Sequence, residues 1–384
     1  MNCRSCNSTD LQLILDLGEM PLANALLETP DQLCKKYPLD VWFCNDCTLV
    51  QISETVAPEI LFSDYAYFSS YSDTVVQNAA ELVEHVMWKY EPQTVVEIGS
   101  NDGYLLQHYP EDIKILGFEP AENIAKVANA KGISTDASFF TKRVAQILCV
   151  MPADIIHANN VLAHVADLND FVEGIAILLA DNGTVIIEVP HVKELVTHCE
   201  FDTIYHEHLC YFSISAIHNL LQRHGLHIHA VEPIPIHGGS IRIFAMKRPS
   251  SFKIVHDETS LPSYYKGFAE AVVWYRNHFK KFLDDLRHVC GPIVAYGAAA
   301  KGAVLLNYCG VGAEILDYIV DRSPHKQGKY MPGVRLPIFP VEMLLEDQPN
   351  YCLILAWNHA DEIMKQLSEY KGKFIIPIPN VRVV

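Results

Sequence analysis

The sequence predicts an α/β protein built from three parts. About 60 N-terminal residues hold two cysteine pairs and show little helical periodicity. From Thr94 onward, short apolar strands alternate with helical stretches, and a second alternation of the same kind begins near Ile293. Such alternation is typical of a parallel sheet that is covered by helices on both faces. We therefore expect a small N-terminal module followed by two α/β domains.

Length, composition and charge restrict the class of protein. A chain of 384 residues is longer than one hydrophobic core usually serves, which agrees with two or three domains. No apolar run approaches the roughly 20 residues that cross a bilayer, and the polar N-terminus lacks the apolar core of a signal peptide. We therefore expect a cytoplasmic protein without membrane contacts. A formal net charge of -17 argues against broad electrostatic binding to nucleic acid, because such binding needs Lys and Arg opposite the phosphates.

Two cysteine pairs near the N-terminus predict a metal site. Cys3 and Cys6 form one CxxC knuckle, and Cys44 and Cys47 form another. Each knuckle can present two thiolates to one ion, and together they complete the tetrahedral set that zinc prefers. Four free thiols or redox pairs are the alternatives, but reduced cysteines within one compact segment favour zinc. A closed set of four thiolates leaves no open position for chemistry, so we expect the ion to stabilise the fold.

Two helices and a series of buried strands are predicted after the module. Ser72 is expected to cap a helix, because apolar residues recur at helical spacing from Val75 to Tyr90. A second helix is expected to bridge the two α/β domains over residues 264–288. The expected strands are 95–98, 113–118, 154–158, 184–189, 240–246, 293–296, 315–320, 352–355 and 373–376.

The turn after the first of these strands is a candidate ligand site. Glu97 lies near the end of a buried strand, and glycines at 99 and 103 let a ligand approach the backbone where a Cβ would obstruct it. The next strand ends at Glu119, a carboxylate placed to accept hydrogen bonds from both hydroxyls of an adenosyl ribose. A purely structural strand-to-helix turn, common to doubly wound domains, is the alternative.

These two turns resemble the S-adenosylmethionine-binding signature of class I methyltransferases. The acidic-x-Gly turn and the acidic end of the second strand carry the resemblance. The cofactor-binding residues that it implies are Glu97, Gly99, Asn101, Gly103, Glu119, Asp136 and Asn159. The turn lacks the GxGxxG pattern of a nicotinamide-binding fold, which disfavours a dehydrogenase.

Four consecutive polar residues, Tyr205, His206, Glu207 and His208, are candidates for proton transfer. Burying them costs free energy unless each polar group has a partner. A neutral imidazole accepts a proton near neutral pH, and a carboxylate can fix its tautomer and orientation. A second metal site that uses both histidines, or a hydrogen-bonded structural cluster, are the alternatives.

The second α/β pattern opens with a candidate phosphate site. Gly297 and Lys301 lie between a strand and the start of a helix, where free N–H groups and the positive helix end suit an anion. Asp321 follows the next strand, where a ribose-binding acid often sits. Close helix packing on small residues is the alternative. The loop at 237–242 offers a second anion site, because Arg242 carries paired donors.

Taken in order along the chain, these motifs resemble the zinc-containing sugar C-methyltransferases, whose best-known members methylate C3 of dTDP-linked 4-keto-deoxysugars. The resemblance covers essentially the whole chain. It implies a zinc-binding domain over residues 1–65 and a central class I, Rossmann-like methyltransferase domain over 66–250. A C-terminal Rossmann-like α/β domain over 251–384 would help to hold the nucleotide sugar.

The same resemblance implies roles for the site residues. His208 matches the general base of the family, with Tyr205 and Glu207 beside it, and His164 and Tyr67 match further positions near the sugar. The expected catalytic residues are therefore His208, Tyr205, Glu207, His164 and Tyr67. The expected substrate-binding residues are His206, Arg242, Gly297, Lys301 and Asp321.

The predicted activity is S-adenosylmethionine-dependent C-methylation of a dTDP- or other nucleotide-linked 4-keto-6-deoxysugar, at C3. A hydrogen next to a ketone is acidic because the carbanion delocalises as an enolate, so a positioned base suffices to remove it. An O- or N-methyltransferase acting on a small metabolite is the nearest alternative. A non-catalytic zinc-bearing interaction protein and a nicotinamide oxidoreductase that uses residues 297–321 are the others.

Overall fold

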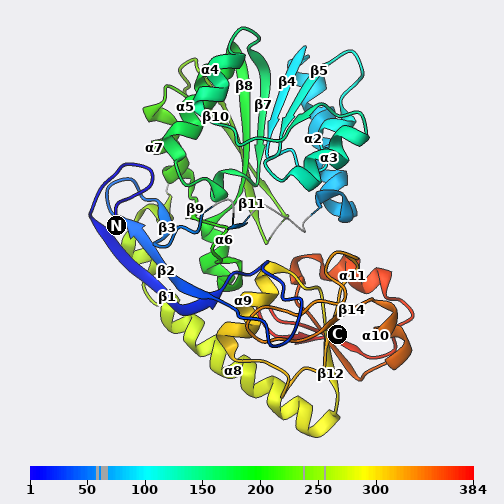
Figure 1. The fold of residues 1–384 in the computed structure, drawn as a ribbon. Coiled ribbons are helices and arrows are strands. Elements are labelled where there is room, and N and C mark those ends of the chain that lie inside the picture. The colour runs from blue at the N-terminus through cyan, green and yellow to red at the C-terminus, as the bar shows by residue number, and fades with distance from the viewer. Residues whose placement is uncertain (58–59, 62–67, 237, 255–256) are drawn as a thin grey trace.

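Among the residues that it describes, a computed structural model of the chain contains three β-sheets, one in each of the expected parts (Figure 1). It describes residues 1–57, 60–61, 68–236, 238–254 and 257–384. Figure 1 shows the central part above the C-terminal part, with strands β1 and β2 running along one side of both. Among the described residues, no helix is both long and apolar enough to span a membrane.

The N-terminal sheet is antiparallel and has the strand order β1-β2-β3-β9. Its first three strands are β1 (Leu11–Pro21), β2 (Lys36–Cys44) and β3 (Val50–Ile52). The fourth strand, β9 (Cys210–Tyr211), comes from the central part of the chain. The sequence analysis predicted no strands in this module. Register shifts between Leu13 and Leu15 and between Asp16 and Glu19 explain this, because they interrupt the alternation that marks a strand.

The central sheet has seven strands in the order β10-β11-β8-β7-β4-β5-β6. Its strands are β4 (Thr94–Ile98), β5 (Lys114–Phe118), β6 (Thr135–Asp136), β7 (Ala153–Asn159), β8 (Leu179–Pro190), β10 (His227–Ile234) and β11 (Ser240–Met246). Five neighbouring strands, β8, β7, β4, β5 and β6, are parallel to one another. Strand β11 is antiparallel to both of its neighbours, β10 and β8. The carboxyl ends of β4, β5 and β7 therefore meet at one edge of the sheet.

Helices cover both faces of this sheet. They are α2 (Asp73–Tyr90), α3 (Glu122–Ala130), α4 (Lys142–Leu148), α5 (Leu168–Leu178) and α7 (Ile214–Arg223), whereas α6 (Val192–Thr197) lies between the sheet and the C-terminal part in Figure 1. Val95 and Ile155 pack with α2 in one core, whereas Val96 and Ile156 belong to the core that includes α5 and α7. Adjacent strand residues point to opposite faces, so a sheet that is buried on both sides reads as a continuous apolar run.

The C-terminal sheet has six strands in the order β14-β13-β12-β15-β16-β17. They are β12 (Ile293–Tyr296), β13 (Ile319–Val320), β14 (Ile338–Phe339), β15 (Tyr351–Ile354), β16 (Lys373–Ile376) and β17 (Arg382–Val383). All are parallel except β17. Its helices are α9 (Ala300–Cys309), α10 (Glu342–Asp347) and α11 (Ala360–Gln366).

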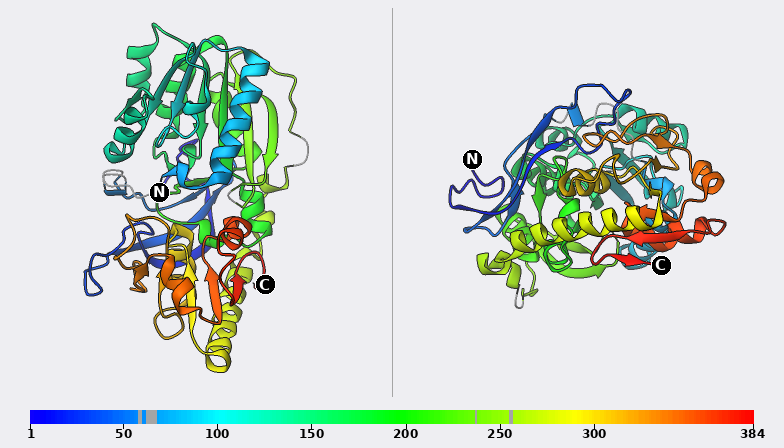
Figure 2. Two further views of the ribbon diagram at one scale, coloured as in Figure 1. Left: turned by 90° about the vertical axis from the view of Figure 1, so that its right-hand side faces the viewer. Right: turned by 90° about the horizontal axis from the view of Figure 1, so that it is seen from below.

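Both predicted helices are present. The Ser72 hydroxyl accepts a hydrogen bond from the Val75 N–H and caps α2, as expected. The bridging helix is α8 (Phe268–Cys290), which runs along the C-terminal part in Figure 2. The N-terminal module also reaches the C-terminal part, because Leu27 and Tyr330 form an antiparallel bridge.

Candidate active site and metal centre

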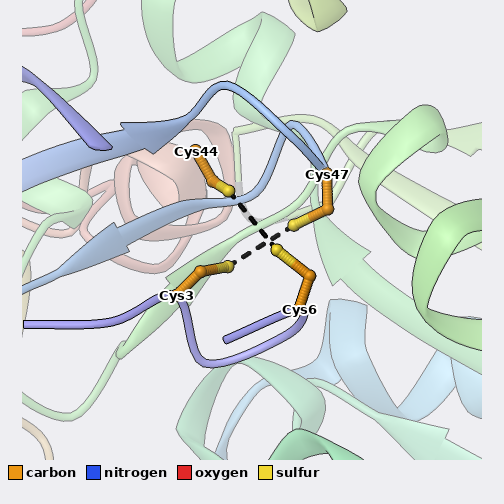
Figure 3. Close-up of side chains that lie close together, drawn as sticks. All are labelled: Cys3, Cys6, Cys44 and Cys47. Carbon is orange, nitrogen blue, oxygen red and sulfur yellow. Dashed lines mark hydrogen bonds between the residues drawn. The ribbon is translucent and has the colours of Figure 1, made fainter. Parts of the chain in front are cut away.

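The four knuckle cysteines lie together, as Figure 3 shows, with their Sγ atoms all within 4.8 Å of one another. The Sγ atoms of Cys3 and Cys47 are 3.4 Å apart, and those of Cys6 and Cys44 are 3.6 Å apart. A tetrahedron with Zn–S bonds of 2.3 Å has S–S edges of about 3.8 Å, so the thiols fit a zinc ion. All four ligands come from the protein, which makes the site a structural one.

A cavity of about 590 Å³ lies between the central and C-terminal parts of the chain and is lined by both. Ten of the predicted site residues line it: Gly99, Asn101, Glu119, Asn159, His164, Tyr205, His208, Gly297, Lys301 and Asp321. Six do not: Glu97, Gly103, Asp136, His206, Glu207 and Arg242. Tyr67 lies outside the described residues.

The carboxyl ends of β4 and β5 form one wall of the cavity. Gly99 has a φ of +72°, and a Cβ there would lie 3.0 Å from Val161. The Glu119 carboxylate accepts hydrogen bonds from the backbone N–H groups of Asn101, at 3.1 Å, and of Ala121, at 2.9 Å. Burial raises the pKa of Glu119. A glycine turn beside an acidic strand end is the cradle that an adenosyl cofactor requires, so these residues fit S-adenosylmethionine.

Three of the predicted cofactor residues lie away from this wall. Glu97 is fully buried within β4, and burial raises its pKa well above the usual range, helped by the charge of Glu119. Gly103 has a φ of +80°, which favours glycine, and a Cβ there would also meet the Ile133 side chain. Asp136 is exposed at the end of β6. Glu97 and Gly103 therefore shape the turn that Gly99 and Glu119 present to the cavity.

Two imidazoles and a phenol meet at the cavity. The His208 Nδ1 lies 3.2 Å from the Thr203 carbonyl oxygen, and its Nε2 lies 2.9 Å from the Tyr205 hydroxyl. Because a carbonyl only accepts, Nδ1 carries the proton and Nε2 is the acceptor in this arrangement. The His164 and His208 rings meet edge to face, 4.7 Å apart. Burial lowers the pKa of His164 to about 4, so this ring is neutral near pH 7.

The structure corrects the expected positions of three residues. The His206 Nε2 lies 3.1 Å from the Pro38 carbonyl oxygen, so this imidazole faces the N-terminal sheet and not the cavity. Glu207 is also buried behind the cavity wall. Arg242 forms a buried salt bridge of 2.9 Å with Glu188 on β8, so its paired donors are not available to an anion.

Small and basic residues of the C-terminal sheet form the opposite wall. Gly297 has a φ of +93°, and a Cβ there would lie 3.1 Å from Ala356. The Asp321 carboxylate accepts a hydrogen bond of 2.7 Å from the Ala298 N–H. The Lys301 Nζ donates to Asn358 at 2.8 Å and lies 4.3 Å from the centre of the Trp357 ring. Burial lowers the pKa of Lys301, although the nearby Asp202 and Glu200 oppose this shift.

The sequence analysis missed several residues of the cavity wall. Arg322 and Lys326 lie in the loop that follows β13 and Asp321, and both line the cavity. The cluster of basic residues after an acidic strand end was a usable signal for an anion. Asn24 and Asn160 also line the cavity, but isolated asparagines carry no such signal.

Comparison with known proteins assigns each part of the chain. A "Methyltransferase domain" family model matches residues 70–231, a "C-methyltransferase C-terminal domain" model matches 235–379, and a "Putative zinc binding domain" model matches 3–62. The chain is 33% identical to C-methyltransferase NovU of Streptomyces niveus, over 100% of this chain and 96% of that protein.

Solved methyltransferase structures are more distant. Magnesium protoporphyrin IX methyltransferase of Synechocystis PCC 6803 is 15% identical, with 45% of this chain and 83% of that chain covered and a TM-score of 0.37. The N-methyltransferase NodS of Bradyrhizobium japonicum is 11% identical, with coverages of 44% and 93% and a TM-score of 0.35. These likenesses are too low to bear on the activity.

The full-length match to NovU is what decides the family. It favours carbon as the methyl acceptor, and it argues against the non-catalytic and nicotinamide-dependent alternatives. The cysteine cluster is suited to zinc and the central domain is of the S-adenosylmethionine-dependent type. The chain is therefore a member of the zinc-binding, S-adenosylmethionine-dependent C-methyltransferase family.

Proposed function

We propose that the substrate is a dTDP- or other nucleotide-linked 4-keto-6-deoxysugar, which is methylated at C3 within the cavity. One observation carries this proposal. On one wall the Nε2 of His208 meets the hydroxyl of Tyr205, and basic side chains lie on the opposite wall. A keto sugar carried on a diphosphate needs both features, a base at one end and cations at the other.

His208 is the proposed general base. Its Nδ1 is held by the Thr203 carbonyl, which leaves Nε2 to take the proton from the carbon beside the ketone. In the structure, the Tyr205 hydroxyl donates to that nitrogen. When substrate is bound, the same hydroxyl can instead donate to the ketone oxygen, where negative charge develops as the proton leaves. His164 packs edge to face on His208 and restricts the orientation of its ring.

The glycine turn and Glu119 are proposed to hold S-adenosylmethionine, with Asn101 and Asn159 beside them. When bound, the cofactor supplies an electrophilic methyl group. Gly99 leaves room for it at the backbone, and Glu119 can accept hydrogen bonds from its ribose. The walls of the cavity keep water from the carbanion, which would otherwise be reprotonated.

Lys301, Lys326 and Arg322 are proposed to bind the diphosphate of the sugar nucleotide, with Gly297 and Asp321 shaping this end of the cavity. In a chain with a net charge of -17, an anionic substrate needs such local cations. The proposed division of labour follows the expected domains: 1–65 binds zinc, 66–250 carries cofactor and base, and 251–384 holds the nucleotide. We place this reaction in the cytoplasm, where sugar nucleotides and S-adenosylmethionine meet.

Incubation with a panel of dTDP-, GDP- and CDP-linked 4-keto-6-deoxysugars tests the proposal. Mass spectrometry should show the gain of one methylene in at least one sugar. In heavy water, NMR should show exchange of the C3 hydrogen of that sugar. An O- or N-methyltransferase would leave the C3 hydrogen in place. Methylation without any such exchange, at C3 or at another carbon, would reject the enolate route.

A further inference from the structure

The segment that carries the proposed base is hydrogen-bonded to the N-terminal module, which comprises residues 1–57. Strand β9, which begins two residues after His208, pairs with β3 of the module. Just before it, the Ile52 N–H donates to the Leu209 carbonyl at 3.0 Å. The buried His206 ring meets the Pro38 carbonyl. The module thus supports the polypeptide on both sides of His208.

One side chain of the module, that of Asn24, lines the cavity. Asn24 lies in the loop after β1, and its Nδ2 is 2.7 Å from one carboxylate oxygen of Glu207 and 2.8 Å from the other. The two residues are 183 positions apart in sequence, and Glu207 is only 3% exposed. The Asn24 amide therefore restricts where the Glu207 carboxylate can lie.

Glu207 connects this contact to both imidazoles. Its peptide bond joins it directly to His208. Hydrogen bonding to the Glu207 backbone raises the pKa of His164 against the stronger effect of burial. The Leu209 N–H also donates to the Ala163 carbonyl at 2.7 Å, which ties the two histidine segments together. A displacement of Glu207 would therefore move the rings of both histidines.

We propose that Asn24 of the N-terminal module is a positioning residue for His164 and His208, acting through the carboxylate of Glu207. The assignment rests on the proposed function of the two histidines. It gives the module a part in catalysis, because the residue that orients the base belongs to it. A structural zinc would then affect catalysis only indirectly, because it stabilises the module that carries Asn24.

Asn24→Asp is the test variant, because it keeps the size of the side chain and sets a carboxylate against a carboxylate. Asn24→Leu removes the donor without adding charge. Gln77→Glu is the matched control, because the Gln77 amide also donates to a carboxylate, that of Glu81 at 2.8 Å, on the exposed face of α2 away from the cavity and the cysteines. Zinc content and affinity for S-adenosylmethionine are measured in every variant.

Both Asn24 variants should lower kcat by about 10- to 100-fold, the scale of a small misplacement of a reacting group. KM and cofactor affinity should stay within about twofold, since a positioning effect falls on kcat. Zinc content should be unchanged, and Gln77→Glu should match the unaltered protein. An unchanged kcat, a loss of zinc, or an equal loss in Gln77→Glu would overturn the proposal.

A second measurement needs no substrate. In protein labelled with ¹⁵N-histidine, the ring nitrogen signals of His164 and His208, assigned by substitution of each, should move in Asn24→Asp and stay in Gln77→Glu. Signals that stay in place in Asn24→Asp would overturn the proposal. If no sugar of the panel is methylated, the proposed substrate is wrong, and this measurement still decides the role of Asn24.

Discussion

At the scale of the residue, the contact between His164 and His208 is the feature on which the proposed chemistry depends. His164 is kept neutral by burial, and His208 has its Nδ1 committed to a backbone carbonyl. Neither ring needs a metal or a second carboxylate to become a proton acceptor, because a neutral imidazole already has a free lone pair on one nitrogen. What the fold supplies is orientation.

Substitution of His208 by Asn tests this arrangement directly. The change keeps a similar size but removes the basic nitrogen, so turnover should fall by about 10²–10⁴-fold, as for a lost general base. Affinity for cofactor and sugar nucleotide should persist, and the C3 hydrogen should stop exchanging with solvent in NMR. His278→Asn is the control, because this histidine is exposed on α8. Normal exchange in His208→Asn would move the role of base to another residue.

Arg242 shows where reasoning from residue types stops. Its paired guanidinium donors and the glycines before it suggested an anion loop, but Glu188, 54 positions away, occupies those donors. Antiparallel pairing of β11 with β8 places the two residues directly opposite each other. A local motif cannot show such a pairing, because it depends on the strand order of the sheet. His206 was misplaced for the same reason, since its partner lies on β2.

At the scale of the element, short buried strands were the most predictable parts of the fold. The strands Ser240–Met246, Ile293–Tyr296 and Lys373–Ile376 have the predicted bounds, because each is a short apolar run that ends at a polar or turn residue. The expected strand 315–320 is reduced to Ile319–Val320. The pairing of β3 with β9 was not predictable, because each is short and they lie far apart in sequence.

The two zinc knuckles hold the N-terminus against the end of β2, because Cys3 and Cys6 meet Cys44 and Cys47. Cys3→Ser should reduce the zinc content well below one ion per chain and lower the thermal midpoint of the N-terminal module, since binding of a structural zinc contributes to folding. Cys34→Ser is the matched control, because Cys34 lies in the same module outside the cluster. Elemental analysis and thermal unfolding measure both effects. Full zinc content in Cys3→Ser would contradict the assignment.

At the scale of the whole molecule, the cavity depends on how the central and C-terminal parts meet. Lys326 lines the cavity and donates to the Ala298 carbonyl at 2.8 Å, whereas Lys329 points to Glu28 at 2.9 Å. Lys326→Ala should raise the KM for the sugar nucleotide about tenfold or more, because it removes a charge-assisted contact. Affinity for S-adenosylmethionine should not change, and Lys329→Ala should behave as the unaltered protein. Equal KM values in both variants would reject the diphosphate site.

A second feature of this junction is a set of buried charges beside the cavity. The Trp357 indole N–H donates to Asp202 at 2.7 Å, and Lys301 lies over the Trp357 ring. Glu200 is 4% exposed, and burial raises its pKa to about 8, helped by the charge of Asp202 and opposed by that of Lys301. The carboxyl group of Glu200, which lies at the junction, therefore keeps its proton at neutral pH.

The raised pKa of Glu200 makes stability depend on pH in a defined direction. The folded state holds a proton that the unfolded state releases above its pKa of about 4.5, so the free energy of unfolding should fall as pH rises toward 8. Glu200→Gln mimics the protonated form and should flatten this fall between about pH 6.5 and about pH 8.5. The histidines of the unfolded chain still titrate near pH 6.5, but they contribute equally to both proteins, so the difference between the two proteins reports Glu200. Thermal midpoints at the two pH values measure it, with the exposed Glu369→Gln as the control. If the midpoint of Glu200→Gln falls as steeply as that of the unaltered protein, the carboxyl is ionised in the folded state and the junction holds a negative charge.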